Sequence, residues 1–149
     1  EVTRLLTTRA VEARRSGARR VWIDPGIGFG KALDANLDLL ASLEALVASG
    51  WPVALGTSRK SSLGVLAGRA DRRADPAAAV SNATDPPPDD RLEGSLATAL
   101  WAAHCGVDLL RVHDVADTVA ALDAAGFCIT RSFSLDGGVS APSLSVKER

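Results

Sequence analysis

Three short polar segments of the sequence carry the residue types that bind anions and planar nitrogen edges. They are 24–31 (DPGIGFGK), 56–61 (GTSRKS) and 111–114 (RVHD). Each segment directly follows a short apolar run. Charged residues at a strand end are often only solvated. That explanation accounts for one such loop easily and for three of this composition poorly.

The first segment places Asp24 in front of a glycine-rich loop. A carboxylate accepts two parallel hydrogen bonds from a planar N–H edge, so Asp24 could read a guanidinium or an aminopyrimidinone ring. The alternative is an ion pair with Arg19 or Arg20. The glycine spacing is not the G-x-G-x-x-G of dinucleotide-binding loops, and Ala32 after Lys31 lacks the hydroxyl that a P-loop needs.

The second segment combines Arg59 and Lys60 with Ser58 and Ser61 near the expected start of a helix. Backbone N–H groups at a helix N-terminus and nearby hydroxyls favour a carboxylate or phosphate. The alternative is an ordinary helix cap by Ser58 or Ser61. The two adjacent cations favour the anion site.

The third segment offers Arg111 and His113, which alternate and therefore share one strand face. A guanidinium and an imidazole together suit a phosphate or diphosphate. A lone histidine at a strand end is more often structural, and His104, on a predicted helix, is expected to be only structural.

The elements that must position these segments alternate between helix and strand. Apolar spacing predicts helices that begin near residues 2, 34, 92 and 115, the second of them capped by Asp34. The run 21–23 predicts a strand buried on both faces, 53–55 a second buried strand, and 109–112 a third strand. Short links indicate a parallel α/β sheet, either doubly wound or a slice of a (β/α)8 barrel, whose ligands bind at the carboxyl ends of the strands. The glycines expected to end the helices are Gly17, Gly50, Gly106 and Gly126.

Two stretches fit no such element. Residues 68–91 are rich in Asp, Arg and Ala and contain three successive prolines at 86–88, which predicts a surface excursion with extended geometry. Residues 127–149 are Ser-rich and stay unassigned, with a disordered tail as the expectation.

Composition limits the classes of protein that remain. A chain of 149 residues with 46% hydrophobic and 23% charged residues is one folded domain. A net charge of -1 argues against binding nucleic acid or a membrane surface by bulk charge. No apolar run reaches the ~20 residues of a spanning helix, and without a secretory signal a cytoplasmic location is expected. Cys105 and Cys128 lack metal-ligand spacing, and Cys105 is expected to be a buried structural thiol.

The three segments, in this order, resemble the C-terminal signatures of dihydropteroate synthase over residues 1–126. The resemblance implies the last three βα units of a (β/α)8 TIM barrel, preceded by one helix. That family joins p-aminobenzoate to 6-hydroxymethyl-7,8-dihydropterin diphosphate and releases diphosphate with Mg²⁺. It also uses apolar helices as a homodimer face, so a homodimer is possible here.

The resemblance also implies roles for individual residues. Asp24 would hold the aminopyrimidinone edge of the pterin, and Lys60 would hydrogen-bond the same ring. Arg111 and His113 would bind the diphosphate, with Arg111 also over the pterin face. No protein nucleophile is needed, so Lys60, Arg111 and His113 would act by positioning and charge stabilisation. The other substrate-binding residues would be Phe29, Gly56, Ser58 and Ser61.

The family's N-terminal half has no counterpart in this sequence. It supplies the Mg²⁺ ligand, further pterin-binding residues and two mobile loops, so no metal ligand is expected here and the chain is expected to be a fragment with half a site. The alternatives are a non-catalytic pterin-binding remnant or paralogue, and a related pterin-binding methyltransferase. The segment 58–61 favours the synthase over the methyltransferase.

A chain with half a site should show negligible synthase turnover when it is purified alone. Formation of dihydropteroate from p-aminobenzoate and the pterin diphosphate measures this directly. Clear turnover without a complementing half would contradict the expectation.

Overall fold

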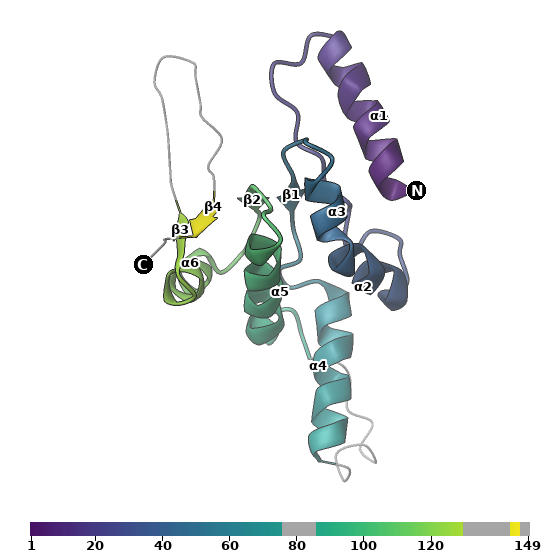
Figure 1. The fold of residues 1–149 in the computed structure, drawn as a ribbon. Helices are drawn as coiled ribbons and strands as arrows, with labels where there is room; N and C mark the ends of the chain where they lie inside the picture. Colours follow the sequence, from purple (N-terminus) through teal and green to yellow (C-terminus); the bar gives the residue numbers. More distant parts are fainter. Residues whose placement is uncertain (76–85, 130–143, 147–149) are drawn as a thin grey trace.

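The computed structural model describes residues 1–75, 86–129 and 144–146 (Figure 1). Helices α1 and α4 lie at opposite ends of the described part, with the strands and the other helices between them. The helices are α1 Val2–Arg15, α2 Leu33–Ala41, α3 Leu43–Val47, α4 Ser61–Ala74, α5 Leu92–His104 and α6 Val115–Ala124. The strands are β1 Ala54–Leu55, β2 Leu109–Leu110, β3 Phe127–Ile129 and β4 Leu144–Val146. Over these residues, no helix combines the length and apolarity that crossing a membrane requires.

A small parallel sheet forms the centre of the α/β fold. Strand β1 pairs with β2 in parallel, with Ala54 opposite Leu109, and Ile23 forms a parallel bridge to Val53 on the other side. The three apolar runs therefore lie side by side in sequence order, with helices in the connections, as predicted.

The strands are shorter than predicted at two places. In 21–23 only Ile23 takes part in the sheet, and the run 109–112 stays in the ladder only to Arg111, whose N–H donates to the Leu55 carbonyl at 2.8 Å. Beyond that point the N–H of His113 turns to the Ser58 hydroxyl instead of a strand carbonyl. A side chain thus replaces the sheet as the partner, and the strand ends.

The predicted second helix is two helices, and Asp34 is not its cap. The N–H of Asn36 donates to the Ala32 carbonyl, so α2 begins before Asp34 and leaves that carboxyl in the first turn. Ser42 separates α2 from α3, and its hydroxyl donates back to the Asp38 carbonyl at 2.7 Å. This local bond competes with regular helix bonding, which explains the break. The other three predicted helices are confirmed.

The surface excursion predicted for 68–91 is wrong for residues 68–74, because α4 continues to Ala74. Gly64 is buried in this helix, and a Cβ there would lie 2.6 Å from Nε of Arg91. The glycine therefore allows a close approach between the helix and the start of α5. Residues 86–90 end in a turn closed by the Asp90 N–H and the Pro87 carbonyl, and the part of the excursion at 76–85 lies outside the described residues.

The tail expected to be disordered contains a strand pair. Strand β3 pairs with β4 in antiparallel fashion, with Cys128 opposite Ser145. Two strands of three residues are too short to show an apolar period, so no pattern in the sequence indicated them. The rest of the tail, 130–143 and 147–149, lies outside the described residues.

The core lies between the sheet and the helices α1, α3 and α5. Leu43 and Val53 have no exposed surface, and Cys105 is buried at 7% exposure, which confirms the expected structural thiol. Burial raises the pKa of the Cys105 thiol, with a smaller contribution from the negative charge of Glu44. The buried cluster consists of Ala10, Ile23, Ile27, Leu43, Leu46, Val53, Leu55, Ala102, Cys105 and Val107.

Replacing Leu43 with Ala should destabilise the fold by about 2–5 kcal/mol, because it leaves a cavity where no surface is exposed. Urea unfolding measures the change. Leu5→Ala is the matched control, since Leu5 is 56% exposed on α1 and its truncation should cost less than about 0.5 kcal/mol. Equal losses for both variants would show that Leu43 does not belong to the core.

Candidate functional site

The three polar segments meet at the carboxyl-terminal edge of the parallel sheet. They follow Ile23, β1 and β2, and parallel pairing places the ends of these strands at the same edge. We call the residues 24–31, 56–61 and 111–114 at this edge the rim.

Asp24 and Arg111 lie near each other on the rim. Oδ2 of Asp24 is 4.0 Å from Nη2 of Arg111, and the side chains are 38% and 62% exposed. Oδ1 of Asp24 accepts the N–H of Gly26 at 2.7 Å, which fixes the carboxyl against its own loop. Arg111 lies over Gly56, where a Cβ would be 2.7 Å from Nη2. The alternative ion pair of Asp24 with Arg19 or Arg20 is absent from the described residues, and Arg111 takes that position.

Ser58 and His113 connect the second and third segments. The buried Ser58 hydroxyl accepts the backbone N–H of His113 at 3.2 Å and lies 3.0 Å from Nδ1 of the same residue. Neither serine caps α4: its N-cap residue is Lys60, no side chain caps it, and Ser61 is the exposed first residue of the helix. The simple capping alternative is therefore wrong.

Lys60 lies against the glycine-rich loop of the first segment. Its Nζ is 3.7 Å from the centroid of the Phe29 ring, and that ring is 61% exposed. A Cβ at Gly28 would lie 2.8 Å from Cδ of Lys60, and φ at Gly28 is 78°. Glycine thus provides both the turn and the space for the lysine stem.

The side chain of Asn36 holds the glycine-rich loop in place through hydrogen bonds, a role that the sequence did not lead us to predict. Its side chain, 3% exposed, accepts the N–H of Gly28 at 2.7 Å and donates to the carbonyls of Lys31 and Ala32. Lys31 also bonds inside the loop, to the Gly26 carbonyl at 2.8 Å. The sequence signal that could have indicated this role is an amide side chain at a helix position where the spacing predicts an apolar residue.

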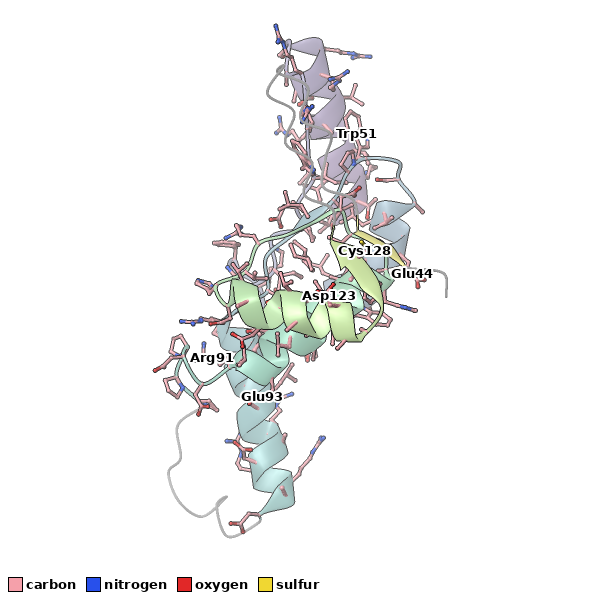
Figure 2. The ribbon with its side chains drawn as sticks, turned by 90° about the vertical axis from the view of Figure 1, so that its left-hand side faces the viewer. Glu44, Trp51, Arg91, Glu93, Asp123 and Cys128 are labelled. Atoms are coloured by element: carbon pink, nitrogen blue, oxygen red, sulfur yellow. The ribbon has the colours of Figure 1, made fainter. Side chains whose placement is uncertain are left out.

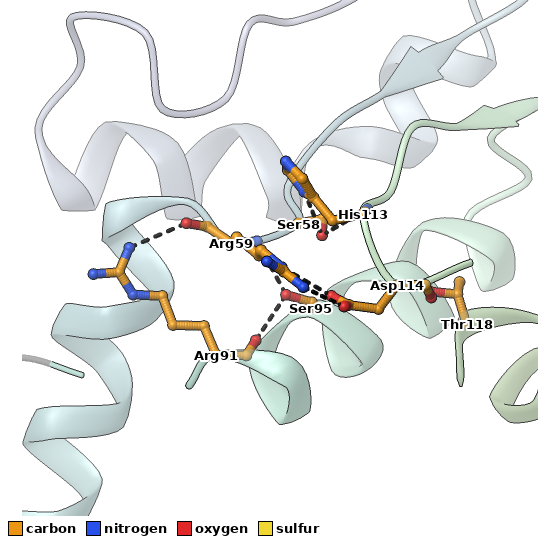
Figure 3. A network of polar contacts seen from close by, with 7 residues as sticks. All are labelled: Ser58, Arg59, Arg91, Ser95, His113, Asp114 and Thr118. Carbon is orange, nitrogen blue, oxygen red and sulfur yellow. Dashed lines mark hydrogen bonds and ion pairs between the residues drawn. The ribbon is translucent and has the colours of Figure 1, made fainter. Parts of the chain in front are cut away.

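Arg59 is not free to bind an anion, because Asp114 occupies it. Nε and Nη2 of Arg59 donate to the two oxygens of Asp114 at 3.1 and 2.5 Å (Figure 3). The hydrogen bond to Asp114 raises the pKa of Arg59, and the same bond lowers the pKa of Asp114. Of the two cations expected at 59–60, only Lys60 is therefore available to a ligand.

Among the described residues, no three His, Cys, Asp or Glu side chains gather as metal ligands. The chemistry of the rim is instead that of a carboxylate beside a guanidinium, an ammonium and an imidazole.

A hollow of about 390 Å³ lies away from the rim, at the entry to the strands. In Figure 2, Trp51, which lines it, lies well above Arg91, which is near the rim. No rim residue lines it, so it is separate from the candidate site. Its lining residues are Arg14, Arg19, Arg20, Val21, Trp22, Gly50, Trp51 and Pro52.

Residues 1–113 match the family model described as "Pterin binding enzyme". The dihydropteroate synthase of Neisseria meningitidis serogroup C is 39% identical to the chain over 127 residues, which is 83% of this chain and 39% of that protein. The chain therefore spans about two fifths of the length of the curated relatives it matches.

Solved structures show the same similarity. The dihydropteroate synthase of Xanthomonas albilineans in complex with 7,8-dihydropteroate is 44% identical with a TM-score of 0.69, and the match covers 83% of this chain and 42% of that one. The dihydropteroate synthase of Thermus thermophilus in complex with 6HMPPP is 40% identical with a TM-score of 0.70. That match covers 83% of this chain and 43% of the other. The fold of the chain thus agrees with that of these dihydropteroate synthases over 83% of its length.

The Arg59–Asp114 ion pair should make the stability of the fold depend on acid pH. Because Arg59 lowers the pKa of Asp114, the pair stabilises the folded chain above the ordinary value of 3.8, and this stability is lost as the pH falls through the lowered pKa. Asp114→Asn should lower the urea midpoint near neutral pH and flatten its fall below pH 3.8.

The matched control for this pH series is Glu12→Gln, which removes the exposed Arg9–Glu12 pair on α1. It should change the curve little, since exposed pairs contribute at most about 1 kcal/mol. Identical pH curves for the native chain and Asp114→Asn would show that the carboxylate of Asp114 is not stabilised in the folded state.

Proposed function

The chain belongs to the pterin-binding enzyme family, and from this premise we propose that its rim forms part of a dihydropteroate synthase site in one portion of a (β/α)8 barrel. The observation that carries the proposal is the meeting of Asp24, Arg111, Lys60 and the Ser58–His113 pair at one edge of the sheet. The related structures that hold 7,8-dihydropteroate and 6HMPPP support this class of substrate.

Asp24 is the group suited to the pterin. Its Oδ1 takes one bond from the Gly26 N–H, which orients the carboxyl, and its oxygens still have acceptor capacity toward the solvent side. An aminopyrimidinone edge presents two parallel N–H donors, the geometry that a carboxylate accepts. Arg111 at 4.0 Å would lie next to that ring.

Lys60 and Phe29 would border the pterin and the p-aminobenzoate. The ammonium has no carboxylate partner among the described residues, and it lies on the face of an exposed aromatic ring. A ring bound beside Phe29 would gain apolar contact, while Lys60 would donate hydrogen bonds to carbonyl or ring acceptors of the pterin. Ser61, exposed at the first residue of α4, lies in the same segment.

Arg111 and His113 would hold the diphosphate. Arg111 presents an exposed planar guanidinium, which binds phosphate oxygens through two parallel hydrogen bonds. The Ser58 hydroxyl already accepts the His113 backbone N–H, so its own proton can go to Nδ1. The proton of the neutral imidazole then sits on Nε2, where it can be donated to a bound oxygen.

These side chains suit a substitution at the methylene carbon of the pterin diphosphate. The bond from that carbon to the diphosphate oxygen breaks, and its electron pair leaves on diphosphate while the electron-rich ring stabilises the cation. The aniline nitrogen of p-aminobenzoate then forms the new C–N bond and releases a proton to solvent. Arg111 and His113 stabilise the charge that develops on the leaving group. The Mg²⁺ that the family uses would supply further charge stabilisation on the diphosphate when bound.

A second candidate is a pterin-binding protein without turnover. The groups suited to the pterin, Asp24 and Lys60, would serve such a protein equally, because they bind a ring without changing it. Calorimetry with the pterin diphosphate followed by an assay for dihydropteroate separates the two, since only the synthase converts what it binds. A methyl-transfer assay with a methylated folate tests the third possibility, a related methyltransferase.

Lys60→Ala and Arg111→Ala should each weaken binding of the pterin diphosphate by about tenfold or more, because each removes a charged hydrogen-bond donor. Isothermal titration calorimetry on the 149-residue chain measures this. Arg9→Ala, on the exposed face of α1, is the control of matched type and should bind as the native chain does. Native affinity in both rim variants would refute the assignment.

A further inference from the structure

Arg59 adopts a backbone conformation that residues with a side chain rarely take. Its φ is 59°, and no other non-glycine residue of the described ranges has a positive φ. Such strain persists only where the surroundings hold the residue on several sides, and it is concentrated at functional sites.

Four contacts hold Arg59, and they involve its backbone as well as its guanidinium. Its N–H donates to the Ser95 hydroxyl at 3.1 Å, and its carbonyl accepts Nη1 of Arg91 at 3.1 Å. Its guanidinium donates to both oxygens of Asp114, as Figure 3 shows. Ser95 in turn donates to the Arg91 carbonyl at 2.7 Å, so the start of α5 forms the supporting surface.

Each partner of the ion pair is a rim residue and the chain neighbour of another rim residue that is proposed to bind substrate. Arg59 stands between Ser58, which bonds His113, and Lys60, which lies over Phe29. Asp114 directly follows His113, and its own carbonyl accepts the Thr118 hydroxyl in the first turn of α6. The pair therefore ties the second and third segments together one residue away from the groups that would bind the substrate.

We propose that Arg59 is a positioning residue, whose fork-like ion pair with Asp114 sets the Ser58–His113 contact and the direction of Lys60. What these groups bind rests on the proposed function, but their placement does not. A purely stabilising role would lower the unfolding midpoint without changing His113. A positioning role changes the imidazole while the fold persists.

The test uses the histidine ring ¹⁵N signals, because the chain has two histidines. Ser58 should hold neutral His113 in one tautomer and so keep its two ring shifts far apart. Arg59→Gly keeps the positive φ without strain and removes the side chain with its guanidinium, and Asp114→Asn keeps the shape and removes the charge. In both variants the difference between the two ring ¹⁵N chemical shifts of His113 should become smaller, because the two tautomers then interconvert.

His104 on α5 provides an internal reference, since its ring contacts Trp101 and lies outside the network. Its signals should stay unchanged in both variants, as should those of His113 in the control Arg9→Ala. The double variant Arg59→Gly with Asp114→Asn should show the same His113 signals as Arg59→Gly alone, because the Arg59–Asp114 ion pair is already lost in the single variant. Unchanged His113 signals in either folded single variant would overturn the proposal.

Ligand binding gives the second readout. If the native chain binds the pterin diphosphate, Arg59→Gly should weaken that binding by about 10- to 100-fold although the Arg59 guanidinium is engaged by Asp114 rather than by the ligand. Native affinity in this variant would also overturn the proposal. If the native chain binds no pterin diphosphate, the proposed function fails, and the His113 signals still decide the role of Arg59.

Discussion

Parallel pairing of β1 with β2 is the constraint on which the candidate site depends. The rim segments lie far apart in the sequence, and only the register that puts Ala54 opposite Leu109 brings their ends together. A slip of one residue would move Arg111 by about 3.3 Å and turn it to the other face of the sheet. The carboxyl of Asp108, which accepts the Val53 N–H at 2.8 Å, and the fully buried Val107 and Val53 secure this register.

Two glycines of the rim leave the space that its two long cationic side chains occupy. Arg111 lies over Gly56 and the Lys60 stem over Gly28, and at both positions a Cβ would come within 2.8 Å of the long side chain. Each of these cations therefore packs on the backbone of another rim segment, Arg111 on the second segment and Lys60 on the first. Long side chains lose rotamer freedom when they are placed, and contact with a fixed backbone limits where they can go.

The sequence predicted the order of elements because each depends on local patterns. Apolar spacing indicated α1, α5 and α6, and the polar residues after the apolar runs indicated the rim. The break at Ser42 is also local, since the Ser42 hydroxyl donates to the Asp38 carbonyl, but apolar spacing does not show it. The other failures depend on tertiary partners: the extension of α4 past Gly68 and the pairing of β3 with β4. The pairing of Arg59 with Asp114 was not predicted for the same reason, since the two residues are 55 positions apart.

The division of cations at the rim explains how a chain of net charge -1 can offer a local anion site. Arg59 is neutralised by Asp114, and Lys31 donates to carbonyls of its own loop, so both serve the structure. Lys60 lies on an aromatic face and Arg111 stands 4.0 Å from Asp24, which is beyond direct hydrogen bonding. Those two keep donors for a ligand. The structural pairs fix the loops, and the less tightly held cations can then receive charge without a large rearrangement, which is the arrangement that electrostatic catalysis favours.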